Sequence, residues 1–408
     1  MRIASSTIFD TGTSQLNKLQ SNLARTQQQI ATNRRMLTPA DDPIASARAL
    51  EVVQSQSVNA QFGINRQNAR AALSEEELAL TGVTNALQDA QAIAVKAGNA
   101  ALSPADRESL AGELSGQLED MLRLANSTDG AGDFIFGGYK TKTAPFARTA
   151  DGAQYLGDQG QRQLQVSTSR KVPVGDSGSA VFENNRTGNG TFVISAPIGN
   201  TGTGVVSTGS VADGSKLTGN QYEISFAVSG TSAGMTYTVL DKKTGVAPAG
   251  MSGPQPFQPG QQIAFDGMSF AVSGNPAAGD KVNIDPSTKQ SVFTTLTDLI
   301  ATLRAPTTTG VERTALSNGL NRATENLTSA FETALSARST VGSRQKELDT
   351  LDSAGEDLGI QYASTLSTLQ DLDLVAAITS YSQQQQTLEA AQKSFKSLSG
   401  LSLFNYIG

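Results

Sequence analysis

Apolar residues near the beginning of the chain recur at every seventh position. The line consists of Phe9, Leu16, Leu23, Ile30 and Leu37, and residues 1–38 contain no Pro. A seven-residue interval places such side chains on one narrow stripe of an α-helix, as in coiled coils. The pattern predicts a helix over residues 1–38 whose stripe needs a partner helix.

A tight turn is predicted directly after this helix, in the segment Thr38-Pro39-Ala40-Asp41-Asp42-Pro43. The two prolines interrupt the helix, Asp42 suits the cap of the next helix, and Pro43 suits its first position. Asp41 and Asp42 could also form a carboxylate pair for metal or acid–base chemistry. Acidic residues flanked by Pro at a helix start are usually caps, so we predict a turn made by Pro39, Asp41, Asp42 and Pro43.

Two further helical stretches follow, one reaching about Gly98 and one running from Ser103 to about Asn126. In the second stretch Ser103 is a suitable cap, with Pro104 in the first turn and Asp106 favoured by the helix dipole. Two seven-residue lines mark the buried side of the first stretch: Leu73, Leu80, Leu87 and Ala94, and beside them Val83, Ala90 and Ala97.

The pattern changes from Phe134, where short β-branched or aromatic segments alternate with Gly, Asn, Asp and Pro. Such segments predict the short strands of a sandwich or barrel-like insert. The clearest of them are Gln163 to Val174, Thr191 to Ser195, Gln221 to Val228, Met235 to Leu240 and Gln262 to Val272.

Helical periodicity returns near Gln290 and continues to the end of the chain. We assign the apolar residues from Leu374 to Phe395 that keep a seven-residue interval, together with Ile378, to a second terminal stripe. The seven-residue lines are Leu320, Leu327, Ala334, Val341 and Leu348, and after a phase shift Leu374, Tyr381, Leu388 and Phe395.

The fold class expected from these patterns is α+β. Neither terminal stripe can bury itself, so the two chain ends are expected to pair as antiparallel helices, with the β-rich part inserted between the helical halves. The expected divisions are 1–42 and 369–408 as terminal assembly segments, 43–183 and 289–368 as the helical body with a β-hairpin region in its first half, and 184–288 as the β-rich insert.

The outer faces of the terminal helices carry few charges and many small or amide residues, including Gln27 to Gln29 and Gln383 to Gln386. Amides and hydroxyls lose water at a lower cost than charges do. One hypothesis is that the ends are loosely ordered in the free monomer and become ordered on assembly. The alternative is an ordinary helical bundle that is complete within one chain.

Composition excludes several classes of function. The net charge of −6 and the pI near 5.0 argue against nucleic acid, and no apolar run approaches the roughly 20 residues of a membrane span. The first residues do not resemble a cleavable signal peptide, so secretion would need another route. Cys and His are both absent, which removes disulfides, thiol nucleophiles, Cys/His zinc sites and histidine bases.

The remaining chemical motifs also favour structural explanations. Asp371 and Asp373 lack the further oxygen ligands and the Gly of a calcium loop, and are expected on a solvated or N-terminal helix face. Phe136-Gly137-Gly138-Tyr139 is not followed by the Lys-Ser/Thr of a phosphate-binding loop and predicts a turn. We therefore expect no enzyme activity, catalytic residue, metal site or cofactor.

Several ordered blocks of the sequence resemble the flagellin superfamily, and more narrowly the family of the third hook-associated protein. They are Met1-Arg2-Ile3, Leu37 to Pro43, Ala97 to Asp106-Arg107, Leu124-Ala125-Asn126, Phe134 to Tyr139, Ala337-Arg338, Val341 to Arg344, Asp371 to Leu374 and Ser399 to Ile407. The prolines at 39 and 43 depart from the turn that is typical of flagellin. The Asn-Ile-Ala-Asn-x-x-Thr-Pro-Gly-Tyr motif of the first hook-associated protein is missing from the first 60 residues.

This resemblance implies a structural subunit at the junction between the flagellar hook and filament. It implies a flagellin-like rod of helices with an outer β-rich domain, exported by the flagellar type III apparatus and located outside the cell. The implied partners are the first hook-associated protein, flagellin, a ring of copies of the same chain, and a cytoplasmic export chaperone. The implied assembly contacts are Phe9, Leu16, Leu23, Ile30, Leu37, Leu374, Ile378, Tyr381, Leu388 and Phe395.

Three alternatives remain at this stage. The chain could be a flagellin that builds the filament itself, which would differ in copy number. The β-rich insert could act as an adhesin or sugar-binding module, although it has Phe and Tyr but no Trp. A hydrolase that uses Ser and Lys is the third alternative, whereas a His-Glu-x-x-His metalloprotease is excluded because His is absent.

Overall fold

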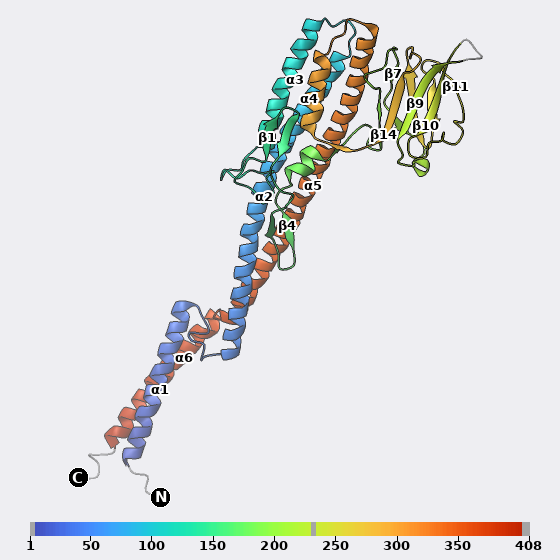
Figure 1. The fold of residues 1–408 in the computed structure, drawn as a ribbon. Coiled ribbons are helices and arrows are strands. Elements are labelled where there is room, and N and C mark those ends of the chain that lie inside the picture. The colour runs from blue at the N-terminus through green and yellow to red at the C-terminus, as the bar shows by residue number, and fades with distance from the viewer. Residues whose placement is uncertain (1–4, 230–233, 402–408) are drawn as a thin grey trace. The chain divides into compact units, whose positions relative to one another are not determined.

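The computed structural model describes residues 5–229 and 234–401 (Figure 1). The chain divides into two compact units, one formed by residues 1–64 with 350–408 and the other by residues 65–349. The division falls inside two long helices, α2 (Pro43–Ala97) and α5 (Gly310–Gln370). Both long helices therefore contribute to both units. The fold is α+β, as the sequence predicts.

In the first unit the terminal helices α1 (Ser5–Thr32) and α6 (Leu374–Leu401) lie side by side and antiparallel (Figure 1). The predicted pairing of the chain ends is therefore confirmed. The prediction that the first helix continues to residue 38 is wrong. Asn33 adopts a positive φ of 51° and the Arg34 N–H donates to the Gln29 carbonyl at 3.2 Å, which ends the helix before Leu37.

The second unit has a continuous apolar core between its helices. These helices are α3 (Pro104–Ala125), α4 (Val292–Arg304) and the parts of α2 and α5 that belong to this unit. The two predicted lines on α2 and the line from Leu320 to Leu348 on α5 are buried throughout. Ser103 caps α3 in a capping box, because its hydroxyl accepts from the Asp106 N–H at 3.2 Å while the Asp106 carboxylate accepts from the Ser103 N–H at 3.0 Å.

Short hairpins connect α3 to the β-rich insert. In this region Phe136 and Phe182 make an edge-to-face aromatic contact, with ring centroids 5.2 Å apart. The elements are β1 (Phe146–Thr149) paired with β2 (Gly152–Tyr155), β3 (Gln163–Gln165) paired with β4 (Lys171–Pro173), the π-helix η1 (Ser179–Glu183), and β5 (Asn185–Arg186) paired with β15 (Lys289–Gln290).

The insert contains two antiparallel sheets that share one apolar core. The five-stranded sheet has the order β11-β10-β9-β14-β6, and the four-stranded sheet has β12-β13-β7 with β8 also paired to β13. The strands are β6 (Phe192–Ser195), β7 (Val205–Val206), β8 (Ser210–Val211), β9 (Tyr222–Val228), β10 (Met235–Asp241), β11 (Gln255–Pro256), β12 (Gln262–Phe265), β13 (Met268–Ser273) and β14 (Lys281–Pro286), with the 3-10 helix η2 (Gly214–Lys216) after β8.

Two segments predicted as single strands are hairpins. Residues 163–174 form β3 and β4, and residues 262–272 contain β12 and most of β13. Asp266 and Gly267 have positive φ values of 42° and 78°, as the two central residues of a tight hairpin turn require. The Asp-Gly pair is the sequence signal for this hairpin turn.

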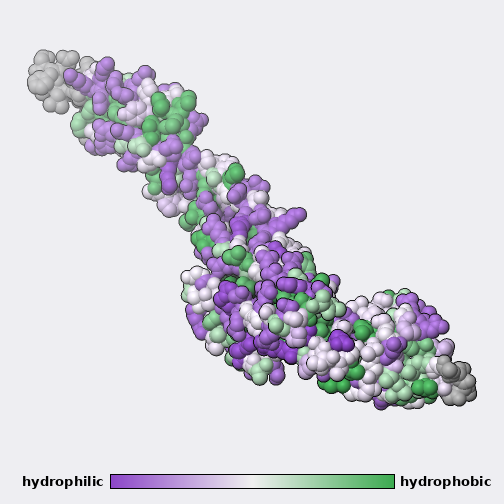
Figure 2. Space-filling view, turned by 90° about the horizontal axis from the view of Figure 1, so that it is seen from above, coloured by the Kyte–Doolittle hydropathy of each residue, from purple (hydrophilic) through white to green (hydrophobic). Residues whose placement is uncertain are grey.

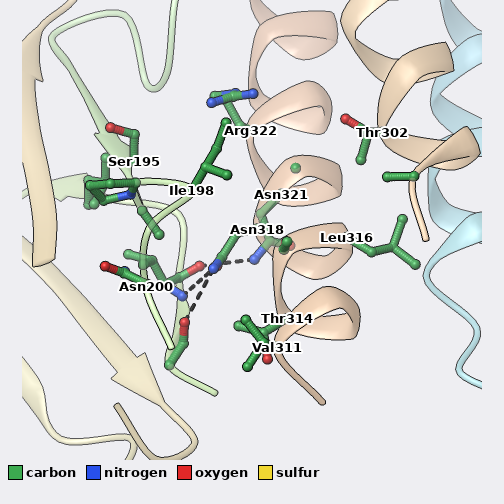
Figure 3. A pocket seen from close by; sticks show the side chains of 18 of the residues that line it. Ser195, Ile198, Asn200, Thr302, Val311, Thr314, Leu316, Asn318, Asn321 and Arg322 are labelled. Atoms are coloured by element: carbon green, nitrogen blue, oxygen red, sulfur yellow. Dashed lines mark hydrogen bonds between the residues drawn. The ribbon is translucent and has the colours of Figure 1, made fainter. Parts of the chain in front are cut away.

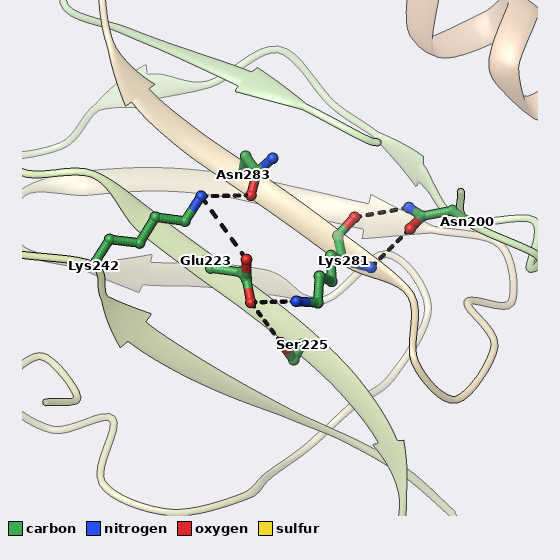
Figure 4. A network of polar contacts seen from close by, with 6 residues as sticks. All are labelled: Asn200, Glu223, Ser225, Lys242, Lys281 and Asn283. Carbon is green, nitrogen blue, oxygen red and sulfur yellow. Dashed lines mark hydrogen bonds and ion pairs between the residues drawn. The ribbon is translucent and has the colours of Figure 1, made fainter. Parts of the chain in front are cut away.

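The outward face of the five-stranded sheet is polar. Glu223 on β9 accepts from Lys281 on β14 at 2.8 Å, and Lys242 lies 3.8 Å from the other Glu223 carboxylate oxygen (Figure 4). The hydrogen bond from Lys281 lowers the pKa of Glu223. Asn200 extends this network, because its side chain donates to the Lys281 carbonyl and accepts from the Lys281 N–H. The sandwich thus exposes charge on one face and buries its aromatic residues on the other.

A buried carboxyl group lies where η1 and its flanking loop pack against the helices of the second unit. Glu76 on α2 is completely buried, and its Oε1 accepts the Asp176 N–H at 2.8 Å. Asp176 pairs with Arg344 at 2.9 Å, while Glu76 Oε2 has no hydrogen-bond partner in the described structure. Burial, together with the nearby Asp176 carboxylate, raises the pKa of Glu76 to about 7.

The change Glu76→Gln is expected to stabilise the protein at pH 8 and to have little effect at pH 5. A carboxyl group whose pKa is higher in the folded state than its usual 4.5 loses stabilising free energy as pH rises from about 4.5 to 7. The expected gain at pH 8 is about 2 kcal/mol. Thermal unfolding followed at both pH values measures it, with Glu113→Gln on the exposed face of α3 as the control. Equal effects of Glu76→Gln at both pH values would contradict the explanation.

Candidate assembly interface

The seam between α1 and α6 is built from apolar residues at alternating intervals of three and four. Such spacing keeps one face of each helix toward its partner. None of these apolar side chains except Ala377 is fully buried, because two helices alone have no interior. The predicted residues on the seam are Leu16, Leu23 and Ile30 on α1 and Tyr381, Leu388 and Phe395 on α6; Leu19, Ala377 and Ala391 join them.

One end of the seam is closed by two aromatic rings. Phe9 and Phe395 have centroids 5.1 Å apart, although half of the Phe9 surface (51%) stays exposed. A Cβ atom added to Gly12 would lie 2.7 Å from the Phe395 ring, closer than such contacts allow. Gly12 is therefore the residue that admits Phe395. Gly12 could have been recognised from the sequence, because it is the only Gly within residues 5–32 and lies on the seam spacing.

A polar contact interrupts the apolar seam near its middle. Thr26 is buried, and its hydroxyl lies 3.1 Å from Gln384 Oε1. The Gln29 amide donates to the Arg35 carbonyl at 2.6 Å, an exposed contact within the same terminal segment. The expectation that Gln384 belongs to the outer face is wrong, because it contacts Thr26 of the partner helix. An amide here satisfies a partner across the helix pair, which heptad counting of apolar residues cannot detect.

The predicted contacts Leu374 and Ile378 do not lie on the seam. Their surfaces are 44% and 55% exposed, and Val375 beside them is 78% exposed. Leu374 is the first residue of α6. At this end of the helix pair α1 has already ended, and Arg34 in the turn after it pairs with Asp371 just before α6. No turn of α1 therefore covers the start of α6. Leu37 lies in that turn and is half-buried. Leu374, Val375 and Ile378 form an apolar patch at the start of α6.

A short backbone ladder fixes the two terminal segments to each other. Arg34 and Asp371 form an antiparallel bridge. On either side, the Arg35 N–H donates to the Gln370 carbonyl at 2.8 Å and the Leu372 N–H donates to the Asn33 carbonyl at 3.3 Å. Because these bonds join backbone atoms of fixed positions, they set the register of α1 against α6.

The turn at Pro39 to Pro43 uses its two acidic residues for structure. Asp41 accepts the N–H groups of Leu37 and Thr38 at 2.8 and 2.9 Å, and these backbone hydrogen bonds lower the pKa of Asp41. Arg25 of α1 also pairs with Asp41 at 2.6 Å. Asp42 accepts the Ala45 N–H at 3.0 Å, and α2 begins at Pro43, as the capping pattern predicts. Pro39 is exposed within the turn.

The second acidic pair has the same kind of role. Asp373 accepts the Ala376 N–H at 3.0 Å at the start of α6, and Asp371 accepts from the Ser367 hydroxyl at 2.6 Å. Within residues 5–229 and 234–401 the structure contains no cluster of acidic side chains that could hold a metal ion. In the same ranges none of the helices combines the length and apolar character of a membrane span.

The first unit exposes more apolar side chains than it buries. Among its described residues, the fully buried apolar side chains are the three alanines Ala45, Ala49 and Ala377. Apolar residues also stand exposed among polar ones on the helical surfaces (Figure 2). The exposed large apolar residues of this unit are Phe9, Ile44, Leu50, Val53, Val58, Ile64, Leu358, Ile360, Leu374, Val375 and Ile378.

Removal of the Asp42 cap is expected to loosen the start of α2. The change Asp42→Ala leaves the Ala45 N–H without its acceptor and costs about 1 kcal/mol of local stability. Amide exchange of residues 44–49 should become about fivefold faster. Asp42→Asn keeps a capping oxygen and is the matched control, which should exchange nearly as slowly as the unchanged chain. If Asp42→Ala left this exchange unaltered, the side chain would not hold the turn.

Comparison with known proteins identifies the family. The family model for the bacterial flagellin N-terminal helical region matches residues 8–141. Flagellar hook-associated protein 3 of Salmonella typhimurium is 28% identical over 99% of both chains. The flagellar junction protein FlgL of Legionella pneumophila is 34% identical, with 79% of this chain and 100% of that chain covered and a TM-score of 0.73.

A second solved relative agrees with the first. FlgL of Xanthomonas campestris is 30% identical, with 77% of this chain and 99% of that chain covered and a TM-score of 0.69. The chain therefore belongs to the hook-associated protein 3 (FlgL) family of flagellar junction proteins, which are structural components of the bacterial flagellum and not enzymes.

Proposed function

We propose that the first unit is the surface through which copies of this chain pack against one another where the flagellar hook meets the filament. The observation that carries this proposal is the absence of an apolar core in that unit's described residues, beside many exposed apolar side chains. A helix pair of this kind gains stability only when further helices cover its outer faces. Neighbouring subunits of a tubular assembly supply such helices.

The energy available to assembly is appreciable at the start of α6. Covering one exposed Val, Leu or Ile contributes about 1–2 kcal/mol. The patch of Leu374, Val375 and Ile378 therefore offers several kcal/mol to each contact, and the exposed residues of α2 add to this. The other proposed assembly residues act mostly indirectly, because they form the seam that holds α1 and α6 together and so orients their outer faces. They are Phe9, Leu16, Leu23, Ile30, Leu37, Tyr381, Leu388 and Phe395.

The division of labour along the chain follows from this arrangement. Residues 1–42 and 369–408 would form the assembly segments, 43–183 and 289–368 the helical body, and 184–288 the outer β-rich domain. The proposed neighbours are the first hook-associated protein on the hook side, flagellin on the filament side, and further copies of this chain in a ring. Before assembly the chain would be held by a cytoplasmic chaperone and exported through the flagellar type III apparatus.

In the free monomer, α1 and α6 are expected to exchange amide hydrogens much faster than α3 does. The seam buries few side chains fully, whereas α3 buries Leu110, Leu114 and Leu118. Hydrogen exchange of the monomer and of isolated flagella should show protection in residues 5–32 that rises at least tenfold on assembly, because assembly covers the outer faces. Strong protection of residues 5–32 in the monomer would mean that the helix pair is complete in one chain.

Placement at the junction is tested by gold-labelled antibody on intact flagella of a strain that depends on this chain. Label is expected in a short zone between hook and filament. Label along the whole length would make the chain a filament subunit, and no label would remove it from the flagellum. The change Val375→Glu with Ile378→Glu should reduce the label at least tenfold, because two carboxylates would be buried in each contact.

The matched control for this variant is Val246→Glu, which replaces an exposed Val (63%, against 78% for Val375) on the β-rich insert. It should leave the label unchanged. Circular dichroism of the purified monomers should show equal helix content for both variants, since acidic residues are favourable in the first turns of α6. If the double variant assembled normally, the patch at the start of α6 would not be an assembly contact.

A further inference from the structure

The β-rich insert contacts α5 through side-chain amides that bind its backbone. Asn318 Oδ1 accepts the Val206 N–H at 2.8 Å, and Asn318 Nδ2 donates to the Gly204 carbonyl at 3.2 Å. One turn further along α5, Asn321 Nδ2 donates to the Val206 carbonyl at 2.9 Å (Figure 3). The two side chains thus occupy the backbone groups at the edge of β7 that a neighbouring strand would otherwise use.

The apolar core of the insert does not extend into the helices. The buried cluster contains residues from Phe192 to Ile284, and the partly buried residues packed on it also lie between positions 196 and 257. No described residue of α4 or α5 belongs to that cluster. Most of the hydrophobic energy that folds the insert is therefore independent of its position against the helices, since of the cluster only Ile194 and Val206 also line the boundary with α4 and α5.

A cavity separates the insert from the helices beside the two asparagines. Its volume is about 470 Å³, and Figure 3 shows Ile198 from the insert and Leu316 from α5 on its lining. The lining also includes Ala196 and Pro197 of the insert and Ala301 and Ala305 of the helices. A space of this size means that these apolar side chains do not pack closely across the boundary. The amide contacts hold the two parts together where apolar packing does not.

The chain enters and leaves the insert through one narrow pair of segments. The Thr187 N–H donates to the Thr288 carbonyl and the Ser287 N–H donates to the Thr191 carbonyl, both at 2.9 Å. The intervening Gly188 and Gly190 have positive φ values of 60° and 82°. Below this pair, the buried Asn326 of α5 accepts the Gly188 N–H at 2.8 Å, so the base of the insert is anchored.

We propose that the insert is a preformed module that pivots about its base at residues 187–191 and 287–288, and that Asn318 and Asn321 are the positioning residues that hold it closed against α5. Opening requires release of the three hydrogen bonds made by Asn318 and Asn321 and of the contact between Glu325 of α5 and the Gly209 backbone. The core between the two sheets stays closed, and of its residues only Ile194 and Val206 line the cavity at the boundary. It also frees the edge of β7. The angle of the insert can then change while the helices keep their packing.

The test uses the full-length chain carrying Asn318→Ala with Asn321→Ala. Amide exchange at Val206 should become at least tenfold faster, because each net hydrogen bond contributes a several-fold factor. Exchange in β9 and β14 should stay unchanged, because their bonds lie within the insert. Since the chain contains no Cys, spin labels at Lys243→Cys and Glu113→Cys report the distance between insert and α3 without interference. Its distribution should be narrow in the parent chain and broad in the variant.

The matched control is Asn283→Ala on the outward face of the same insert, which removes only the hydrogen bond from Lys242. It should reproduce the exchange and distance distribution of the parent chain. An unchanged distribution in the double variant would overturn the positioning role of the two asparagines. Loss of protection in β9 and β14 would overturn the independence of the insert, and a broad distribution already in the parent chain would show that the amides do not hold it.

Discussion

The pairing of α1 with α6 is the constraint on which the rest of the arrangement depends. Two helices in contact share one seam and leave their remaining faces to solvent, so their side chains are half-buried rather than buried. Gly12 brings Phe395 close to α1, and the ladder around Arg34 and Asp371 fixes the register. These features define the geometry of the pair without giving its described residues an apolar core. Under the proposed assembly role, neighbouring subunits would supply the missing cover.

The second unit, in contrast, has an apolar core of its own. Its helices bury complete seven-residue lines, and its α3 has a full capping box. It is stable enough to contain a destabilising group, since Glu76 is buried without a partner for one carboxylate oxygen. The two units therefore differ in burial. The second unit buries long apolar lines, while the described residues of the first unit leave many large apolar side chains exposed.

Periodicity predicted the helices and their buried sides well, because a seven-residue line such as Leu73 to Ala94 is long enough to leave no other interpretation. It failed where a single backbone conformation decides the outcome. Asn33 ends α1 before Leu37, and Asp266 with Gly267 turns one predicted strand into two. It also missed residues whose partners are distant in sequence. Nothing near Asn318 or Thr26 in the sequence distinguishes these from ordinary polar residues on a helix.

Apolar and polar contacts have different tasks in this chain. Apolar burial supplies most of the folding energy but is not directional, so it tolerates sliding and rotation. Hydrogen bonds add little net energy, yet each is satisfied in only one geometry. The chain places them where position matters more than strength: Thr26 with Gln384 across the seam, and Asn318 with the edge of β7. Because such contacts can be exchanged for water at small cost, the same residues that set a position also allow it to change.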